Sequence, residues 1–332
     1  MKAAVLRGFG TPRFEEIPQP VPQDGEELIE VTAAPLNNID RVRADGSHYS
    51  VRSGVPGGSG SGEDAPGAGQ PAVPGVIGAG LRPGGQRVLF GSRLGAMAQY
   101  SVVSPQMTFP IPDGLDDAAA AAVWNPGLSA WLALGWRCPL QSGPTVLILG
   151  ATGVTGKLAI QAARHFGAGR VVAAGRNQPV LDTLPDLGAD ATIQLRQPDA
   201  ALAAAFAAEG GEHGYDVVLD YVWGHPTEVF LGSIDRHDAV PRSSRVRLLQ
   251  AGEMAGPAIT LPASPLRSAG LEILGAGTGT MPPMEVITGM LSELLDLLAA
   301  GKLRIDIERV PLSAVAQVWG RDQQGRRPVF IP

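Results

Sequence analysis

Hydrophobic positions along the chain change their spacing near Asp116, and the change predicts two kinds of structure. Before it, short apolar runs are separated by glycine and proline, a pattern typical of β-strands. These runs are AAVL, ELIEVTAAPL, QRVLFG and AQYSVVS. We therefore expect a mostly β region from Met1 to about Ala122.

From DDAAAAAVWNPGLSAWLALG onward the apolar positions follow a helical period, and strand patterns then alternate with helical ones. This alternation is typical of a parallel sheet covered on both faces. The strands predicted in this part are Val146–Leu149, Val171–Ala174, Ala191–Leu195, Val217–Tyr221, Val246–Gln250 and Glu272–Gly275.

Near the C-terminal end, VITGMLSELLDLLAAGKL has the apolar stripe of an amphipathic helix, and RIDIERVPL and RRPVFIP return to strand patterns. The simplest topology is a β-rich domain built from both chain ends, with a dinucleotide-type domain inserted. We expect residues 1–123 and 281–332 in the first domain and residues 124–280 in the second.

A glycine cluster follows the first strand of the inserted domain, with the spacing G-x-x-G-x-x-G. Glycine permits a tight turn, a close approach of the backbone to a pyrophosphate, and close helix packing. The helix that follows offers free N–H groups and a positive dipole end to phosphates. The cluster predicts a dinucleotide site, with a tight turn that binds nothing as the alternative. Its residues are Gly150, Ala151, Thr152, Gly153, Val154, Thr155 and Gly156.

The second strand of this unit ends at Gly175 and is followed by Arg176 and Asn177. An NAD-selective unit places an acid here, about 20 residues beyond the last glycine, against the ribose 2′-hydroxyl. No acid occurs between Val171 and Gln178. Because arginine pairs with a 2′-phosphate through charge-assisted hydrogen bonds, helped by a neutral donor such as Asn177, we expect NADPH as cofactor. The alternative is a solvated surface arginine.

Composition narrows the ligand classes. The chain has 332 residues, 44% of them hydrophobic, and a formal net charge of −6, with no dense Lys/Arg block. This argues against nucleic acid or an anionic membrane as the partner and favours a small-molecule substrate. Since the chain shows no signal-peptide core and no apolar run of membrane-spanning length, we expect a soluble, cytoplasmic protein.

Metal-ligating residues are sparse. The single cysteine, Cys138, cannot build a disulfide within the chain or a four-thiolate zinc site. The histidines show no paired ligand spacing, and we interpret them as loop or surface residues. They are His48, His165, His213, His225 and His237.

Between Arg52 and Gly75 glycine, serine and proline are dense and no apolar pattern repeats. A flexible surface insertion and a lid over a ligand site both fit this composition.

Several blocks of the chain, in order, carry a likeness to a known family. They are MKAAVLRGFG with EEIPQPVP, PLNNIDRVRADGSHY, GLDDAAAAAVWNPGLSAWLAL, YDVVLDYVWG and LRSAGLEILGAG. Almost the whole chain resembles the medium-chain dehydrogenase/reductase superfamily, specifically its zinc-independent, quinone oxidoreductase-like branch. The resemblance implies an α/β fold in which a Rossmann doubly wound parallel sheet is inserted in a GroES-like β-rich domain. It also implies cofactor and substrate in the cleft between the domains, and a homodimer.

Departures from the zinc-dependent relatives concern the metal. Asn37 stands where they have cysteine, and Gly75–Ile77 where they have Gly-His-Glu. A catalytic zinc would therefore lack its thiolate and imidazole ligands, and we expect no metal. Without a Lewis acid the chemistry suits acceptors that take hydride readily, such as quinones and α,β-unsaturated carbonyls.

The resemblance also assigns residues to the site. Asn37 and Asp40 lie in the loop that faces the nicotinamide in relatives, where Asn37 could donate to a substrate oxygen; a turn residue bonding its own backbone is the alternative. Tyr49 is a candidate proton donor or stacking wall. Ser129 corresponds to a hydroxyl residue that approaches the nicotinamide ribose in relatives, with helix capping as the alternative.

Two further loops are assigned to the cofactor. Tyr221, at the end of the fourth strand, is a candidate cover for it, with a place in the core as the alternative. In GAGTGT the small residues Gly277 and Thr278 would let the backbone approach the nicotinamide amide, and close packing at a subunit edge is the alternative.

The leading hypothesis is an NADPH-dependent, zinc-free oxidoreductase that transfers hydride to a quinone. A double-bond reductase of enones, enals or enoyl thioesters is the alternative, for which RSSRVR, Arg242–Arg247, offers one basic cluster. A non-catalytic NADPH-binding or sensing protein also stays open, because glycines and Arg176 indicate only cofactor binding.

Overall fold

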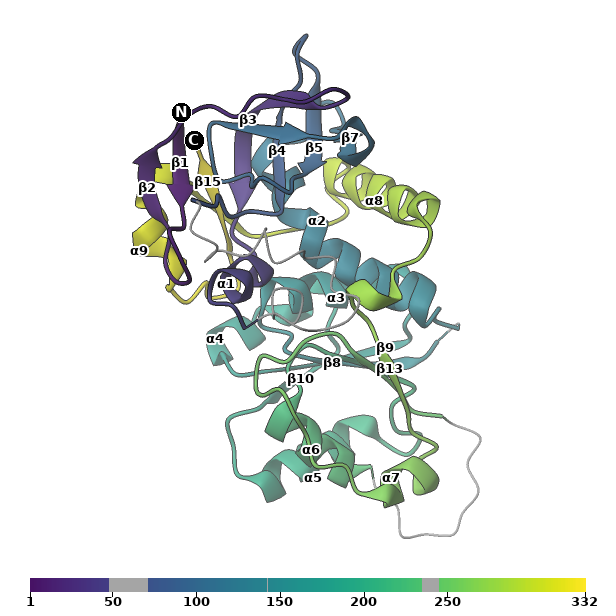
Figure 1. The fold of residues 1–332 in the computed structure, drawn as a ribbon. Helices are drawn as coiled ribbons and strands as arrows, with labels where there is room; N and C mark the ends of the chain where they lie inside the picture. The colour runs from purple at the N-terminus through teal and green to yellow at the C-terminus, as the bar shows by residue number, and fades with distance from the viewer. Residues whose placement is uncertain (48–70, 142, 235–244) are drawn as a thin grey trace. The chain divides into compact units, whose positions relative to one another are not determined.

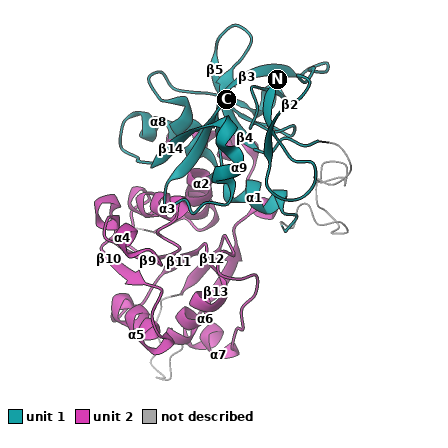
Figure 2. Ribbon diagram, turned by 90° about the vertical axis from the view of Figure 1, so that its left-hand side faces the viewer, with its two compact units in different colours: residues 1–125, 295–332 teal, residues 126–294 magenta. Residues whose placement is uncertain are grey.

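The computed structural model describes residues 1–47, 71–141, 143–234 and 245–332. The chain forms two compact units, residues 1–125 with 295–332 and residues 126–294, which Figure 2 shows in two colours. The first boundary falls inside helix α2 (Asp117–Leu132) and the second inside α8 (Met284–Ala299). We expected the second boundary at residues 280/281, so the units assign the first part of α8 differently from our expectation.

Residues 126–294 contain a six-stranded parallel sheet. The first strand of this unit lies in the middle and the next two lie to one side, which is the strand order of a Rossmann doubly wound sheet. All six predicted strands are confirmed, with each end within one residue of its expected place. In spatial order they are β10 (Ala191–Gln194), β9 (Arg170–Gly175), β8 (Thr145–Leu149), β11 (Val217–Asp220), β12 (Arg247–Gln250) and β13 (Glu272–Gly275).

Helices cover this sheet, as Figure 1 shows. Because the central strands β8 and β9 are buried on both faces, their sequences contain the continuous apolar runs VLIL and VVAA. Phe206 and Phe230 join two helices on one side, with ring centroids 5.4 Å apart. The helices are α3 (Val154–His165), α4 (Gln178–Leu181), α5 (Asp199–Gly210), α6 (Gly224–Ser233) and α7 (Ala263–Ser268), with shorter helical segments at Ala133–Arg137, Leu184–Leu187 and Thr278–Thr280.

Residues 1–125 and 295–332 together form the β-rich unit that the sequence predicts from both chain ends. Its main sheet runs β14 (Ile307–Pro311), β15 (Arg327–Ile331), β3 (Glu27–Pro35), β4 (Ile77–Leu81), β5 (Arg87–Gly91) and β7 (Thr108–Pro110), with β6 (Tyr100–Val103) also beside β3. A second sheet pairs β1 (Lys2–Val5) with β2 (Arg13–Glu16). The described part of this unit also contains the short helices α1 (Asn38–Ala44) and α9 (Val315–Trp319).

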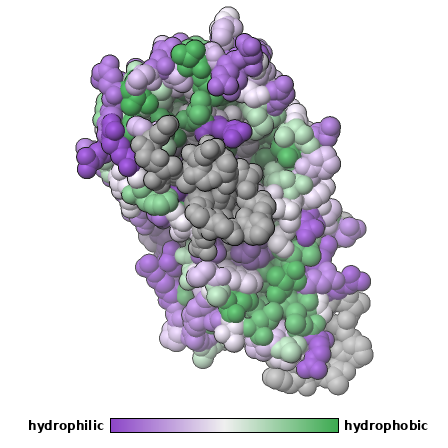
Figure 3. Space-filling model, viewed as in Figure 1, coloured by the Kyte–Doolittle hydropathy of each residue, from purple (hydrophilic) through white to green (hydrophobic). Residues whose placement is uncertain are grey.

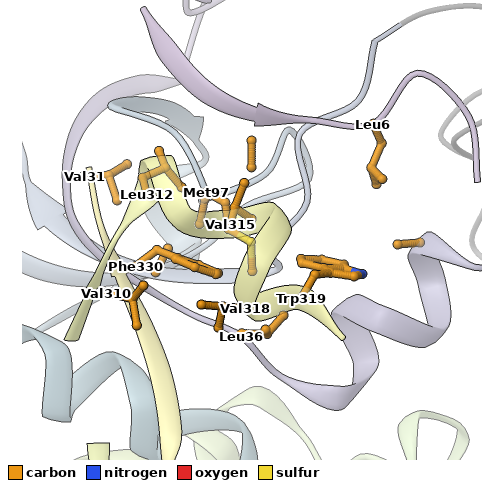
Figure 4. Packing of buried hydrophobic residues seen from close by; sticks show 14 of the residues in the cluster. Leu6, Val31, Leu36, Met97, Val310, Leu312, Val315, Val318, Trp319 and Phe330 are labelled. Carbon is orange, nitrogen blue, oxygen red and sulfur yellow. The ribbon is translucent and has the colours of Figure 1, made fainter. Parts of the chain in front are cut away.

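One apolar core joins the two chain ends of this unit. Figure 4 shows Leu36 beside Val318 and near Val310, below the α9 helix. The main chain adds a hydrogen bond, since the N–H of Leu36 donates to the carbonyl of Pro328 at 2.9 Å. The segment between β3 and α1 is therefore held by residues almost three hundred positions later in the chain.

On the surface, large apolar side chains are exposed in residues 126–294, and Figure 3 shows where hydrophobic surface gathers on one face. In the described part of this range they are Met254, Leu266, Met281 and Met284. Among the described residues, no helix is both long and apolar enough to pass through a bilayer. The cytoplasmic location expected from the sequence stays a prediction.

Candidate functional site

The glycine cluster forms a tight turn between β8 and α3. Gly150 has a φ of +88°, a conformation that favours glycine. The N–H groups of Gly150 and Ala151 both donate to the carbonyl of Ala174, at 2.9 and 2.8 Å. A Cβ at Gly150 would lie 3.0 Å from a methyl group of Val222. The turn therefore packs against the ends of both strands that flank β8.

Gly156 allows α3 to lie directly on this turn. A Cβ at Gly156 would lie 2.4 Å from the Gly150 carbonyl oxygen and 2.5 Å from the Ala151 Cα. Both are backbone atoms that cannot rotate away. At Gly175 a Cβ would meet a Thr152 methyl group at 2.3 Å. The absence of a side chain at Gly156 and Gly175 thus brings the helix, the turn and the next strand together, as expected for a dinucleotide turn.

The N-terminus of α3 presents unpaired main-chain donors. Gly153 is the N-cap, and the N–H of Lys157 donates to its carbonyl at 2.9 Å. The N–H groups of the three residues between them have no acceptor one turn earlier in the helix. They add to the positive end of the helix dipole, so this end of α3 is suited to bind phosphate.

Arg176 follows β9 directly and its side chain is exposed. Within the described residues it forms no hydrogen bond and no ion pair. Asn177 caps α4, with its side-chain oxygen accepting the N–H of Val180 at 3.4 Å. The structure thus gives Asn177 a local role in addition to the donor role expected of it, and leaves the Arg176 guanidinium available for an anion.

Tyr221 lies just beyond β11, beside the Gly150 turn. Its side chain is 8% exposed, and its hydroxyl has no hydrogen-bond partner in the described part of the chain. Burial raises the pKa of the phenol well above its ordinary value, and the Ser129 side chain acts in the opposite direction. Ser129 is inside α2, so the helix-capping alternative for it is wrong. Two hydroxyl side chains therefore lie together at the carboxyl end of the sheet.

Asp220 holds the turn that carries Tyr221. Its carboxylate accepts the N–H groups of Val222 at 2.8 Å and Trp223 at 2.9 Å, and the hydroxyl of Thr227 at 2.7 Å. Burial raises the pKa of Asp220, while these three donors favour its ionised form. Trp223 adopts a φ of +53°, which is unusual for a bulky residue. The sequence analysis did not predict this role of Asp220.

Gly277 and Thr278 lie after β13, the edge strand of the sheet. The N–H of Gly277 donates to the Thr280 hydroxyl at 3.0 Å, which starts a short helical turn at Thr278. The assignment of both residues to the cofactor stays a prediction.

In the β-rich unit, Asn37 is fully buried at the N-cap of α1. Its N–H donates to one oxygen of Asp40 at 2.8 Å, and the N–H of Val76 donates to the other at 3.2 Å. The side-chain oxygen and nitrogen of Asn37 have no hydrogen-bond partner among the described residues. The start of α1 is also a capping box in which the Asn37 side chain faces the N–H of Asp40, so the alternative of a turn residue bonding its own backbone stays open. A buried amide without partners is costly unless a ligand satisfies it.

Asp40 and Arg327 are both buried in this region. Burial raises the pKa of Asp40 to about 6, although its backbone donors and the charge of Arg327 act in the opposite direction. Burial likewise lowers the pKa of Arg327 to about 10, against the charge of Asp40. Sequence reasoning missed Arg327, because an arginine in a C-terminal strand gives no local sign of being buried.

Other expectations have mixed outcomes. Tyr49, residues 52–70 of the possible lid at 52–75 and the first half of the RSSRVR cluster lie outside the described residues. His165 contacts Glu293 at 3.1 Å and stacks on Trp131, and the exposed His225 contacts Asp199 at 2.8 Å. Within the described ranges no group of three or more His, Cys, Asp or Glu side chains could hold a metal ion.

A family model described as zinc-binding dehydrogenase matches residues 154–235. A probable NADPH-dependent quinone reductase of Emericella nidulans is 28% identical, with 100% of each chain covered. A chloroplastic quinone-oxidoreductase of Triphysaria versicolor is also 28% identical, with 98% of this chain and 95% of that one covered. A mycocerosic acid synthase-like polyketide synthase of Mycobacterium tuberculosis is 30% identical, over 64% of this chain and only 9% of its own length.

Solved structures share the fold over the whole chain. The quinone oxidoreductase from Thermus thermophilus has a TM-score of 0.73 and 25% identity, and both chains are fully covered. The Escherichia coli quinone oxidoreductase complexed with NADPH has a TM-score of 0.81 and 19% identity, also with full coverage, and this likeness shows the fold alone. Together with the dinucleotide turn, these matches show that the chain shares the two-domain fold of the quinone oxidoreductases. Along its full length the chain is similar in sequence to the quinone oxidoreductase-like branch of the medium-chain dehydrogenase/reductase superfamily.

Proposed function

We propose that this protein is an NADPH-dependent, zinc-free oxidoreductase that transfers hydride to a quinone. The observation that carries the proposal is Arg176, an exposed cation without a described partner at the position that selects the ribose substituent. The names of the full-length relatives, an NADPH-dependent quinone reductase and a quinone-oxidoreductase, support both the cofactor and the acceptor.

The residues present fit a dinucleotide phosphate. The free N–H groups at the start of α3 would bind the pyrophosphate, and Gly156 keeps the helix close enough for them to reach it. Arg176 would bind the 2′-phosphate through its guanidinium. Tyr221 and Ser129 would supply hydroxyl groups to the nicotinamide end, which would satisfy the unpartnered phenol. When bound, NADPH supplies a hydride from C4 of its nicotinamide.

On the acceptor side, Asn37 is the residue that we assign to the quinone. Its amide nitrogen would donate to a quinone oxygen, which becomes more negative as the hydride arrives. One proton from solvent then completes the hydroquinone, so that two electrons and two hydrogens are accounted for. Asp40, whose two oxygens already accept backbone N–H groups, would act by positioning Asn37.

The double-bond reductase remains the second candidate. Several relatives are polyketide synthases, of which this chain matches a small part, and these support an acyl-chain acceptor. Hydride would add to the β-carbon of an enone or enoyl thioester, and a proton would add to the α-carbon. The same Asn37 donor would serve the carbonyl oxygen.

The proposed function is tested by following NADPH oxidation at 340 nm with three acceptors: a simple quinone, an enone and an enoyl thioester. NADH replaces NADPH in one control, and a chelator is present in another. Quinone turnover that needs NADPH and survives the chelator is the expected result. Turnover of the thioester alone selects the second candidate, and tight NADPH binding without any turnover points to the sensing role.

A homodimer is a separate proposal. Among the described strands, β13 has a neighbour only on the β12 side, so its other edge is open for pairing with a second copy. Light scattering measures the mass, and a value near the 34.4 kDa of one chain would contradict it.

A further inference from the structure

Arg327, in β15, reaches the segment that carries Asn37. Its side chain is 3% exposed, and its Nη1 donates to the carbonyl of Leu36 at 2.7 Å. The N–H of Leu36 is bonded to Pro328, the residue after Arg327, at 2.9 Å. Both polar groups of the main chain at Leu36 are therefore held by one strand, immediately before Asn37.

Asp40 holds the same segment from the other side. It accepts the N–H of Asn37 and that of Val76, so it ties the start of α1 to the segment before β4. The charge of Arg327 favours the ionised form of Asp40, which is the stronger acceptor for these N–H groups. Arg41 is the other nearby cation. It is half-buried and donates to the carbonyl of Arg321 at 3.0 Å.

Fold stability alone does not account for these two buried charged side chains. Buried charges often contribute less stability than apolar residues of the same volume, and the strand residues that follow Arg327 are apolar. The pair does, however, fix the main chain on both sides of an amide whose own polar atoms are unpartnered. This combination is expected where a side chain must keep one orientation for a ligand.

We propose that Arg327 is a positioning residue for acceptor reduction, acting through Leu36 and Asp40 to hold the Asn37 amide ready for the acceptor oxygen. This role rests on the proposed function. It extends that function to a residue outside the dinucleotide turn and far from Asn37 in sequence.

The test compares Arg327→Ala with Arg326→Ala, which removes an adjacent and exposed arginine. We expect Arg327→Ala to lower kcat for the best acceptor about 10- to 100-fold, since small displacements of a reacting group have effects of this size. The NADPH dissociation constant, measured by fluorescence titration, should stay within about twofold of wild type. Millimolar guanidinium should restore part of the lost kcat, whereas sodium chloride at equal ionic strength should not. Arg326→Ala should show neither the loss nor the rescue.

Three results would overturn the role while the proposed function stands. They are unchanged kcat in Arg327→Ala, a loss of kcat matched by an equal loss of NADPH affinity, and a loss that guanidinium does not relieve. If Arg327→Ala does not fold, Arg327→Lys replaces it. This variant keeps the charge but lacks the planar fork, so kcat should still fall at unchanged NADPH affinity, and wild-type kcat would overturn the role. A wild-type protein that reduces no acceptor ends the proposed function and this role together.

Discussion

The dinucleotide turn and the segment Leu36–Asp40, called here the Asn37 segment, are built in opposite ways. The turn at Gly150–Gly156 uses main-chain groups, and its strand partner, Ala174, is only 24 positions from Gly150. The Asn37 segment depends on two buried charged side chains, and Arg327 is 291 positions from the carbonyl it binds. The first site should therefore tolerate most side-chain changes but no added Cβ where backbone meets backbone. The second should respond to charge and pH.

Gly156→Ala should give the largest effect and tests the main-chain half of this comparison. The new Cβ would overlap the Gly150 carbonyl, so α3 must move. We expect a stability loss of about 3 kcal/mol and no measurable NADPH binding. Thermal unfolding and NADPH titration check this. Gly289→Ala, where a Cβ meets nothing within 4 Å, is the matched control and should be neutral or slightly stabilising. Normal NADPH binding by Gly156→Ala would contradict the geometry of the turn.

Arg176→Glu tests the side-chain contribution to the same site. A carboxylate repels the 2′-phosphate of NADPH and accepts a hydrogen bond from the 2′-hydroxyl of NADH. The preference for NADPH over NADH in kcat/KM should therefore fall about 100-fold. Arg267→Glu makes the same charge change on an exposed residue of α7 and should leave the preference as it is. An unchanged ratio in Arg176→Glu would assign the 2′-phosphate to another residue.

Asp40→Asn tests the pH sensitivity of the Asn37 segment. The folded pKa of Asp40, about 6, lies above its ordinary value of 3.8, because burial favours the protonated form. Its stabilising contribution is thus complete below about pH 4 and is lost as the pH rises through 6. The difference in unfolding free energy, wild type minus Asp40→Asn, should fall by about 2 to 3 kcal/mol over that interval. Denaturant unfolding at pH 4, 5, 6 and 7 measures it. A difference that rises with pH would mean that the charge of Arg327 lowers the pKa of Asp40 by more than burial raises it.

Tyr221→Phe should give the smallest effect. The phenol has no described partner, so its removal should change the unfolding free energy by less than about 1 kcal/mol, while NADPH affinity falls about 3- to 10-fold. The control is Tyr215→Phe, which loses a buried hydrogen bond to the Phe206 carbonyl at 2.8 Å. That variant should lose about 1 kcal/mol of stability and keep its NADPH affinity. Equal NADPH affinity in both variants would remove Tyr221 from the cofactor site.

Local patterns account for what could be predicted from sequence. The central strands β8 and β9 are buried on both faces, so their apolar runs are continuous, and the glycines follow β8 directly. Asn37 was named through its family block, but no sequence pattern indicated that its amide lacks partners. Arg327 and Asp220 were missed because each gains its role from contacts made after the chain has folded. The boundary inside α8 could not be predicted from the sequence either, because the helical period continues through it without a break.

The pairing of β15 with β3 has a consequence for the order in which the protein is made. Residues 126–294 are contiguous and contain all six strands of their sheet, so they can fold while synthesis continues. The Asn37 segment must wait for Arg327, 291 residues later than Leu36, which takes about 15 to 60 s at ordinary rates of translation. During that interval the end of β3, Ala34 and Pro35, lacks its β15 partner. A nascent chain would therefore acquire its dinucleotide turn well before its Asn37 segment is held in place.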